Sequence, residues 1–286
     1  MNGRANHVLT FSCPESGGIL GDVGRYFAEH GAVTREAAHF SDPEARRFFF
    51  RAAFEPQADA ASAAGLRAGF APVAQAHDMN WQLYDAGYRP RLLLLVSHYG
   101  HCLDDLLFRY RNGLLEADIV AVASNHETFR DLVEWHGLAF HHLPLQGTRK
   151  REQETRLAEL ADAGGADYIV LARYMQILSN DFCARYPGRI INVHHALLPA
   201  FKGGHPYQRA YDRGVKVIGA TAHFATSDLD EGPIIEQDVA RVHHGHTPED
   251  LASVGQDIER SVLARAVAHA AEHRVLLNGA KTVVFS

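Results

Sequence analysis

The spacing of apolar and polar positions divides the chain into two parts with different repeating patterns. In the first part, Ile19, Leu20, Val23 and Phe27 recur at helical spacing, and the runs on either side have the period of strands. The predicted order is strand 7–13, helix 19–31, strands 33–40 and 46–54, helix 58–70 and strand 72–79. This βαββαβ order is the ferredoxin-like plan.

From residue 91 onward, apolar runs alternate with helical patterns. The runs lie at 91–96, 118–123, 138–143, 167–172 and 189–193, with helices such as 101–113 and 149–165 between them. Two further strands are expected at 215–224 and 233–242, before a helix that begins at Thr247. Such alternation predicts a doubly wound, mostly parallel α/β sheet of the Rossmann-like type. We therefore predict a ferredoxin-like domain at 1–82, a linker at 83–90 and an α/β domain at 91–286.

Composition excludes several classes of protein. The chain has 286 residues and a net charge of −6, without the basic patch that nucleic-acid binding requires. Its longest apolar run, 91–96, is too short to span a membrane, and the first residues do not resemble a signal peptide. Three widely spaced cysteines argue against a disulfide framework. These features predict a cytoplasmic protein without nucleic-acid or membrane partners.

The stretch "IINVHHALLPAF" at 190–201 carries the most chemistry. Side chains alternate between faces along a strand, so Asn192 and His194 share one face and His195 points to the other. They stand at the carboxyl end of a strand, where open α/β sheets bind ligands. An Asn amide can stabilise an oxyanion, and a His can carry a proton at neutral pH. The residues alone leave open whether this pair is catalytic or only caps the strand.

Two other segments offer candidates. The turn 225–235 contains Asp228, Asp230 and Glu231, and nothing in the pattern chooses among the three acids. Thr221 and His223 share a face of strand 215–224, and the stretch 171–178 follows another strand. Each of these segments has packing or loop closure as its alternative explanation.

Phosphate and metal sites are not predicted. The turn 97–102 contains only Gly100, and neither G-x-G-x-x-G nor G-x-x-x-x-G-K-[ST] occurs in the chain. Paired histidines occur at 98 and 101, 141 and 142, 194 and 195, and in 243–246. None of them has the spacing of a known zinc signature, so we predict no catalytic metal.

Together, the motifs of the second part resemble a known family. Residues 191–235 contain, in order, N-x-H, L-L-P, G-[AT]-[TS]-x-H and L-D-x-G-P-I, the pattern of folate-dependent formyltransferase-fold enzymes. The segments "SCPESGGIL", "RRFFFR" and "HCLDDLL" resemble the branch with an N-terminal ACT domain, the formyltetrahydrofolate deformylases. The resemblance covers essentially the whole chain.

This resemblance implies hydrolysis of 10-formyltetrahydrofolate to tetrahydrofolate and formate, which feeds purine and one-carbon metabolism, without a cofactor. Asn192 matches the oxyanion-holding residue of the family, His194 its general acid/base and Asp230 its catalytic acid. The implied substrate-binding residues are Met175, Gln176, Ile177, Leu178, His223 and Thr226. The resemblance also implies glycine or methionine as effectors of the ACT domain, and a homo-oligomer.

The chain departs from the family pattern at Gln176, where a basic residue is common, and at Gly204 and His205 of the "LPAFKGGHP" loop. Three alternative functions follow from the same residues. They are formyl transfer to an amine, an ACT sensor fused to an inactive formyltransferase fold, and a metal hydrolase that uses the paired histidines.

Overall fold

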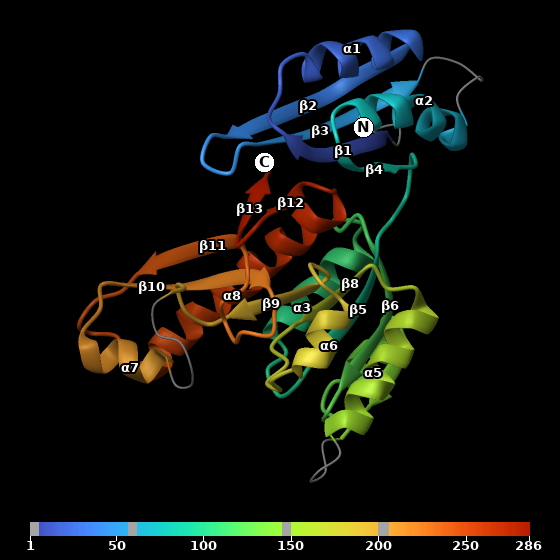
Figure 1. Ribbon diagram of the computed structural model, residues 1–286. Coiled ribbons are helices and arrows are strands. Elements are labelled where there is room, and N and C mark those ends of the chain that lie inside the picture. The colour runs from blue at the N-terminus through green and yellow to red at the C-terminus, as the bar shows by residue number, and fades with distance from the viewer. Residues whose placement is uncertain (1–5, 57–61, 145–149, 200–205) are drawn as a thin grey trace. The chain divides into compact units, whose positions relative to one another are not determined.

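The computed structural model describes residues 6–56, 62–144, 150–199 and 206–286. It divides the chain into two units. The first consists of residues 1–88, 273–278 and 283–286, and the second of residues 89–272 and 279–282. Figure 1 shows both units, with most of their elements labelled.

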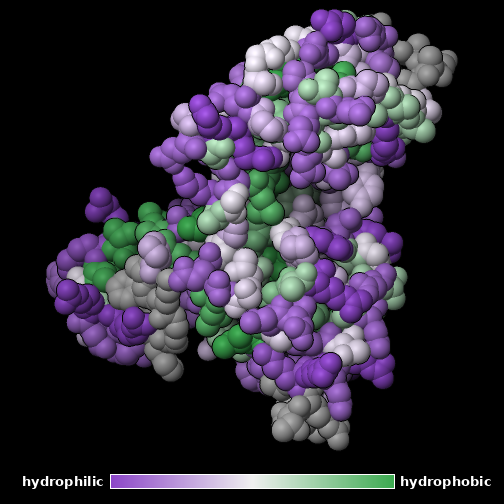
Figure 2. Space-filling model, viewed as in Figure 1, coloured by the Kyte–Doolittle hydropathy of each residue, from purple (hydrophilic) through white to green (hydrophobic). Residues whose placement is uncertain are grey.

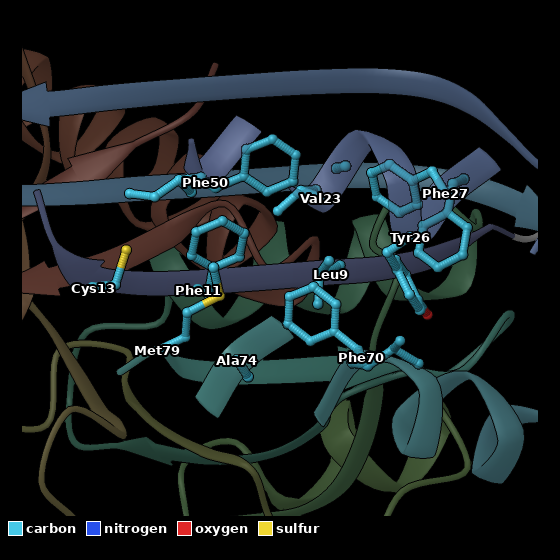
Figure 3. Packing of buried hydrophobic residues seen from close by; sticks show 14 of the residues in the cluster. Leu9, Phe11, Cys13, Val23, Tyr26, Phe27, Phe50, Phe70, Ala74 and Met79 are labelled. Atoms are coloured by element: carbon cyan, nitrogen blue, oxygen red, sulfur yellow. The ribbon is translucent and has the colours of Figure 1, made fainter. Parts of the chain in front are cut away.

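The first unit is a four-stranded antiparallel sheet with two helices on one face. Its elements are β1 (His7–Pro14), α1 (Ile19–Glu29), β2 (Ala32–Asp42), β3 (Arg47–Pro56), α2 (Ala63–Ala76) and β4 (Asn80–Tyr84). The strand order is β2-β3-β1-β4, which confirms the predicted βαββαβ plan. Phe11 of β1 packs with Phe50 of β3 and Phe70 of α2 in the core of this unit (Figure 3).

The prediction of a strand at 72–79 was wrong. Helix α2 continues through Pro72 to Ala76, and the fourth strand lies at Asn80–Tyr84, which overlaps the predicted linker. Leu66, Phe70 and Ala74 are buried at a spacing of four residues, so the helical face extends past the proline. The start of the predicted helix, 58–61, lies outside the described residues.

Near the end of the chain, residues 273–278 and 283–286 group with the first unit, which differs from the predicted domain at 91–286. This end of the chain contains the hairpin β12 (Val275–Asn278) and β13 (Lys281–Val284). Arg274 donates to the Glu36 carboxylate over 2.7 and 3.1 Å, and the His273 ring stacks on Tyr84 with centroids 3.4 Å apart. Each contact joins a residue near the end of the chain to a residue far earlier in the sequence. Strand periodicity is a local pattern and could not predict such pairs.

The second unit contains a seven-stranded sheet of order β11-β10-β9-β8-β5-β6-β7. Neighbouring strands from β9 through β8, β5 and β6 to β7 are parallel, and β10 runs antiparallel to both of its neighbours, β9 and β11. This pattern confirms the predicted mostly parallel sheet. Its elements are β5 (Arg91–Val96), α3 (His101–Arg111), β6 (Asp118–Ser124), α4 (Arg130–Trp135), β7 (Phe140–His142), α5 (Lys150–Gly164), β8 (Tyr168–Leu171), α6 (Asn180–Arg185), β9 (Ile190–His194), α7 (Pro206–Arg213), β10 (Val217–Phe224), β11 (Ile234–Arg241) and α8 (Pro248–Ala271).

The central strands of this sheet are buried on both faces. Leu92 to Val96 of β5 are fully buried, and Leu93 and Leu95 pack into one cluster with residues of α5 and α6. Helix α8 packs against β9, β10 and β11, and also against α3. Its N-terminus has the predicted Thr247 cap, here within a capping box with Asp250. The long helix therefore lies beside the strands that carry the predicted site.

Strand β11 forms one edge of the sheet. On the face drawn in Figure 2, apolar side chains gather over β10 and β11, where Val217 and Val239 are exposed. Among the described residues, no helix combines the length and apolar character needed to cross a bilayer.

Candidate active site

Asn192 and His194 lie on β9, as predicted, and β10 pairs with them in register. His223 stands opposite Asn192, and Thr221 stands opposite His194. The Thr221 hydroxyl donates to the Ala196 carbonyl over 2.9 Å and accepts from the Leu198 amide over 3.0 Å. Strand pairing and this buried hydroxyl therefore fix both the end of β9 and the turn that follows it.

His223 orients the carboxamide of Asn192. The Nδ1 atom of His223 lies 3.0 Å from the Phe224 carbonyl oxygen, and because a carbonyl only accepts, Nδ1 carries the ring proton. Nε2 is then an acceptor, and the Asn192 amide nitrogen donates to it over 3.2 Å. Burial lowers the pKa of His223, which favours this neutral form. The amide nitrogen of Asn192 keeps a second hydrogen for a ligand in the pocket.

His194 and Asp230 form a second pair. The His194 Nδ1 atom lies 3.4 Å from a carboxylate oxygen of Asp230, so Nδ1 carries a proton in this arrangement. His194 Nε2 is buried and has no hydrogen-bond partner among the described residues. Burial alone would raise the pKa of Asp230, but its hydrogen bond with His194 and the neighbouring histidines lower that pKa below the usual value. This geometry leaves His194 Nε2 for proton exchange.

A tight turn places Asp230 at the site. Its backbone is left-handed, with φ +58°. A side chain at Gly232 would lie 1.7 Å from the Phe224 carbonyl oxygen, so only glycine permits this approach of the turn to the end of β10. Asp228 also borders the pocket, while Glu231 is not among the residues that line it. Asp230 is the acid that pairs with His194 Nδ1, at 3.4 Å.

The loop 174–178, which contains four of the implied substrate-binding residues, is anchored on both sides. The Met175 amide donates to the Ser97 hydroxyl over 3.0 Å, and that hydroxyl donates to Asn125 over 2.7 Å. At the far end, the Ser179 amide donates to the Glu154 carboxylate over 2.7 Å. Polar contacts therefore hold the loop to Ser97, which follows β5, and to α5.

All nine predicted site residues border one pocket of about 590 Å³. The pocket is also lined by residues outside the predicted site, including Tyr99, Arg173, Tyr207 and Glu259. His195 also lines it, because β9 ends at His194 and strand alternation does not extend to the next residue. The departures at Gly204 and His205 lie outside the described residues.

Arg173 is the most unusual of these additional residues. Its backbone is left-handed, with φ +61°, in a residue that is only 8% exposed. Such a conformation costs on the order of 1–3 kcal/mol in a residue with a side chain, so surrounding contacts must maintain it. The sequence did carry a signal for it, because the resembled family often has Arg or Lys before Met-x-x-L, and Arg173 stands at that position.

A group of His101, Cys102 and Glu259 could in principle hold a cation, since its ligand atoms lie within 4.8 Å of one another. However, Arg173 lies 3.1 Å from the Glu259 carboxylate and already balances its charge. Burial raises the pKa of the Cys102 thiol well above its usual value, and a protonated thiol is a poor ligand. The charges of this group therefore disfavour a metal ion.

Comparison with known proteins first gives the class. The formyl transferase family model matches residues 90–267, which include the whole pocket. The fold and the site thus define a formyl transferase-domain protein. A crystal structure of glycinamide ribonucleotide transformylase 1 from Symbiobacterium toebii is similar to this chain, with 30% identity and a TM-score of 0.64, over 71% of this chain and 97% of that one.

Two other relatives extend over both units. A formyltetrahydrofolate deformylase of Corynebacterium sp. (strain P-1) is 45% identical over 284 residues, with 99% of each chain covered. The crystal structure of a formyltetrahydrofolate deformylase from Burkholderia mallei matches with a TM-score of 0.94 and 46% identity, over 99% of this chain and 100% of that one. The chain belongs to the formyltetrahydrofolate deformylase family.

Proposed function

We propose that this protein hydrolyses 10-formyltetrahydrofolate to tetrahydrofolate and formate, with water as the formyl acceptor. One observation carries the proposal: Asn192, His194 and Asp230 border a single pocket, and Asp230 lies 3.4 Å from His194 Nδ1. Family membership along both units supports the same reaction. The formate produced would supply purine and one-carbon metabolism.

The first step is attack of water on the formyl carbon. As the new bond forms, the carbonyl electron pair moves to the formyl oxygen, and Asn192 donates its second amide hydrogen to that oxyanion. Because His223 already accepts the other hydrogen, the amide does not need to reorient during the reaction. His223 is thus proposed to position Asn192 in addition to its predicted contact with the substrate.

His194 manages the proton. Its Nε2 atom accepts a proton from the attacking water and then delivers it to the departing folate nitrogen as the carbon–nitrogen bond breaks. Asp230 holds the Nδ1–H of His194 and stabilises the imidazolium that forms between the two steps. Formic acid then loses its proton to solvent, which balances the reaction.

The loop 174–178 is the proposed wall for the pteridine ring. Met175, Gln176, Ile177 and Leu178 line the pocket together with Thr226, whose hydroxyl donates to the Asp228 carbonyl over 3.1 Å. Met175 and Ile177 are exposed by 47% and 62%, apolar surface that a flat aromatic ring would cover. The uncharged Gln176 stands where the family often has a basic residue.

Formate release from 10-formyltetrahydrofolate tests this function, with no amine in the assay. Formate and tetrahydrofolate should appear in equal amounts. If formate appeared only after an amine such as glycinamide ribonucleotide was added, the protein would be a formyltransferase, the alternative that the Symbiobacterium likeness favours. Folate binding without any turnover would indicate a sensor with an inactive site. Activity that strong chelators abolished would indicate a metal hydrolase.

For the first domain, we propose residues 1–82 as an ACT-like regulatory domain of a homo-oligomer, with glycine or methionine as the effector. The antiparallel sheet of order β2-β3-β1-β4 supports this assignment. Repeating the formate assay with each amino acid would test it, and unchanged rates would count against it. The three cysteines are free and buried, which supports a cytoplasmic location.

A further inference from the structure

His195 is held by a fixed positive charge. The Arg173 Nη1 atom lies 2.7 Å from His195 Nδ1. Because a guanidinium group only donates, His195 Nδ1 must accept, and the ring proton must reside on Nε2. His195 thus stands in the pocket as a neutral ring of one tautomer, next to His194 at 5.0 Å between ring centroids.

Arg173 is held in turn by Glu259 of helix α8. This carboxylate is fully buried and lies 3.1 Å from Arg173 Nε. It also accepts hydrogen bonds from His101 Nε2, over 2.8 Å, and from the Tyr207 hydroxyl. Burial alone would raise the pKa of Glu259, but the bond from His101 and the charge of Arg173 lower it below the usual value. Glu259 is therefore an ionised anchor for the arginine.

The packing around this anchor is specific. Tyr207 reaches Glu259 only because position 255 of α8 is glycine, since a side chain there would lie 2.0 Å from the Tyr207 hydroxyl. The other face of the Arg173 guanidinium lies over the Tyr99 ring, 5.2 Å from its centroid. Arg173 is thus fixed from α8 and from the loop before α3, and it points at His195.

We propose that Arg173, held by Glu259, is a positioning residue that keeps His195 neutral and thereby confines proton transfer to His194. This inference rests on the proposed hydrolysis and assigns a role to residues that the proposed mechanism does not use. Two adjacent histidines in one pocket could both accept the proton of water. A proton on His195 would be lost to the reaction, because Asp230 orients the ring of His194, and not that of His195, toward the departing nitrogen. Arg173 closes this second route.

The charges around His195 agree with this role. Burial, followed by the charges of Arg173 and His194, lowers the pKa of His195 to about 4. Glu259 and Asp230 act in the opposite direction but do not reverse the shift. Tyr207 of α7 also lies near the ring, at 6.1 Å between centroids, and burial raises its pKa, so it stays neutral.

The test is a double-mutant cycle of Arg173→Met and His195→Asn, read as the pH dependence of kcat for formate release. Arg173→Met should lower kcat about tenfold to a hundredfold near pH 6, and less at pH 8, as His195 gains an ordinary ionisation. His195→Asn should cost less than about tenfold, because its side-chain oxygen can accept from Arg173. The double variant should lose the added ionisation. A pH-independent loss in Arg173→Met, or an added ionisation that persists in the double variant, would overturn the proposal.

Nitrogen NMR of the histidine rings in the full-length protein provides a readout that does not depend on activity. In the unmodified protein, His195 should be an Nε2–H ring that does not titrate between pH 5 and 8, and in Arg173→Met it should titrate. If the unmodified protein released no formate, the proposed function would fail while this measurement still decided the role of Arg173. A His195 ring that titrates in this pH range in the unmodified protein would refute the proposed role of Arg173.

Two further variants guard against misfolding. Arg173→Lys keeps the positive charge but cannot reach Glu259 and His195 in the same fork geometry, so it should give an intermediate pH profile. Arg89→Met removes an arginine that pairs with Glu116 and Asp118, away from the pocket, and should leave the profile unchanged. A profile for Arg173→Lys identical to that of the unmodified protein would show that charge alone, without the fork, is sufficient.

Discussion

Asp230 combines a strained backbone with a buried carboxylate. Its φ of +58° is tolerated better by Asp than by most residues, and it brings the carboxylate to His194. The carboxylate is ionised at neutral pH, because the histidines around it lower its pKa despite burial. Because the site depends on the position and charge of single atoms, substitutions that keep the shape of a side chain but change one atom test its role.

Asp230→Asn should lower kcat by two to four orders of magnitude with little change in folding. The amide is nearly isosteric, but it cannot stabilise the protonated His194 and it presents a donor to Nδ1. Steady-state formate release and circular dichroism would measure the two effects. Asp228→Asn, in the same turn, is the matched control and should cost far less. Near-normal turnover in Asp230→Asn would mean that another acid is catalytic.

His223 should act through Asn192. His223→Leu removes the acceptor for the Asn192 amide and should lower kcat roughly tenfold to a hundredfold with a smaller change in KM, because the loss falls on the oxyanion. His223→Gln offers a carbonyl oxygen in its place and should recover part of the loss. Kinetics of the two variants would be compared directly. Equal losses in both would argue that His223 only fills space.

At the scale of elements, helix α8 has a glycine where the side chain of Tyr207 packs against it. Gly255 lies within the helix, where glycine is usually unfavourable, and a side chain there would overlap the Tyr207 ring, 2.2 Å from Cζ. Packing against α7 thus explains the glycine. Replacing a glycine inside a helix by alanine is usually stabilising, and here we expect the opposite.

Gly255→Ala should destabilise the protein by about 1–3 kcal/mol, because Tyr207 must leave Glu259 or push α7 away. The comparison is Gly24→Ala in α1, where an added side chain meets nothing within 4 Å and should stabilise by up to about 1 kcal/mol. Denaturant unfolding of both variants would measure the difference in sign. Stabilisation by both substitutions would mean that α7 yields freely.

At the scale of the whole molecule, partly buried neutral histidines predict how stability depends on pH. Burial lowers the pKa of His195 and of His273 to about 4, from an ordinary value of 6.5. Between these values the unfolded chain binds more protons than the folded one, so stability falls as pH falls from about 6.5 toward 4.

At pH 5 each of these histidines should cost at most about 2 kcal/mol relative to pH 7. His273→Gln should therefore be less stable than the unmodified protein at pH 7, where it loses the stack on Tyr84, but should show a shallower decline toward pH 5. Urea midpoints at several pH values would measure this slope. The same substitution at exposed His244 is the control. Parallel slopes for His273→Gln and the unmodified protein would contradict the expectation.

The sequence predicted most of the sheet in each unit, because strand and helix periods are local. It placed β5 at 91–96 correctly, and it put the start of α8 at Thr247, since both signals lie within a few residues. It misplaced β4, because a strand was predicted from Pro72 onward. The helix in fact continues past Pro72, with Phe70 and Ala74 buried on one face. It also missed the grouping of residues 273–278 with the first unit, which depends on partners more than two hundred residues away.

For the site, the sequence by itself determined which side chains are present and, through strand alternation, that Asn192 and His194 share a face. Motif resemblance then separated Asp230 from its two neighbours. Only the tertiary structure decided which side chains surround these residues and how they orient them. It placed His223 behind Asn192, and it brought Arg173 and Glu259 from distant elements to His195. The reason is physical: periodicity is set by the local backbone, whereas tautomers, ionisation and orientation are set by groups that meet only when the chain has folded.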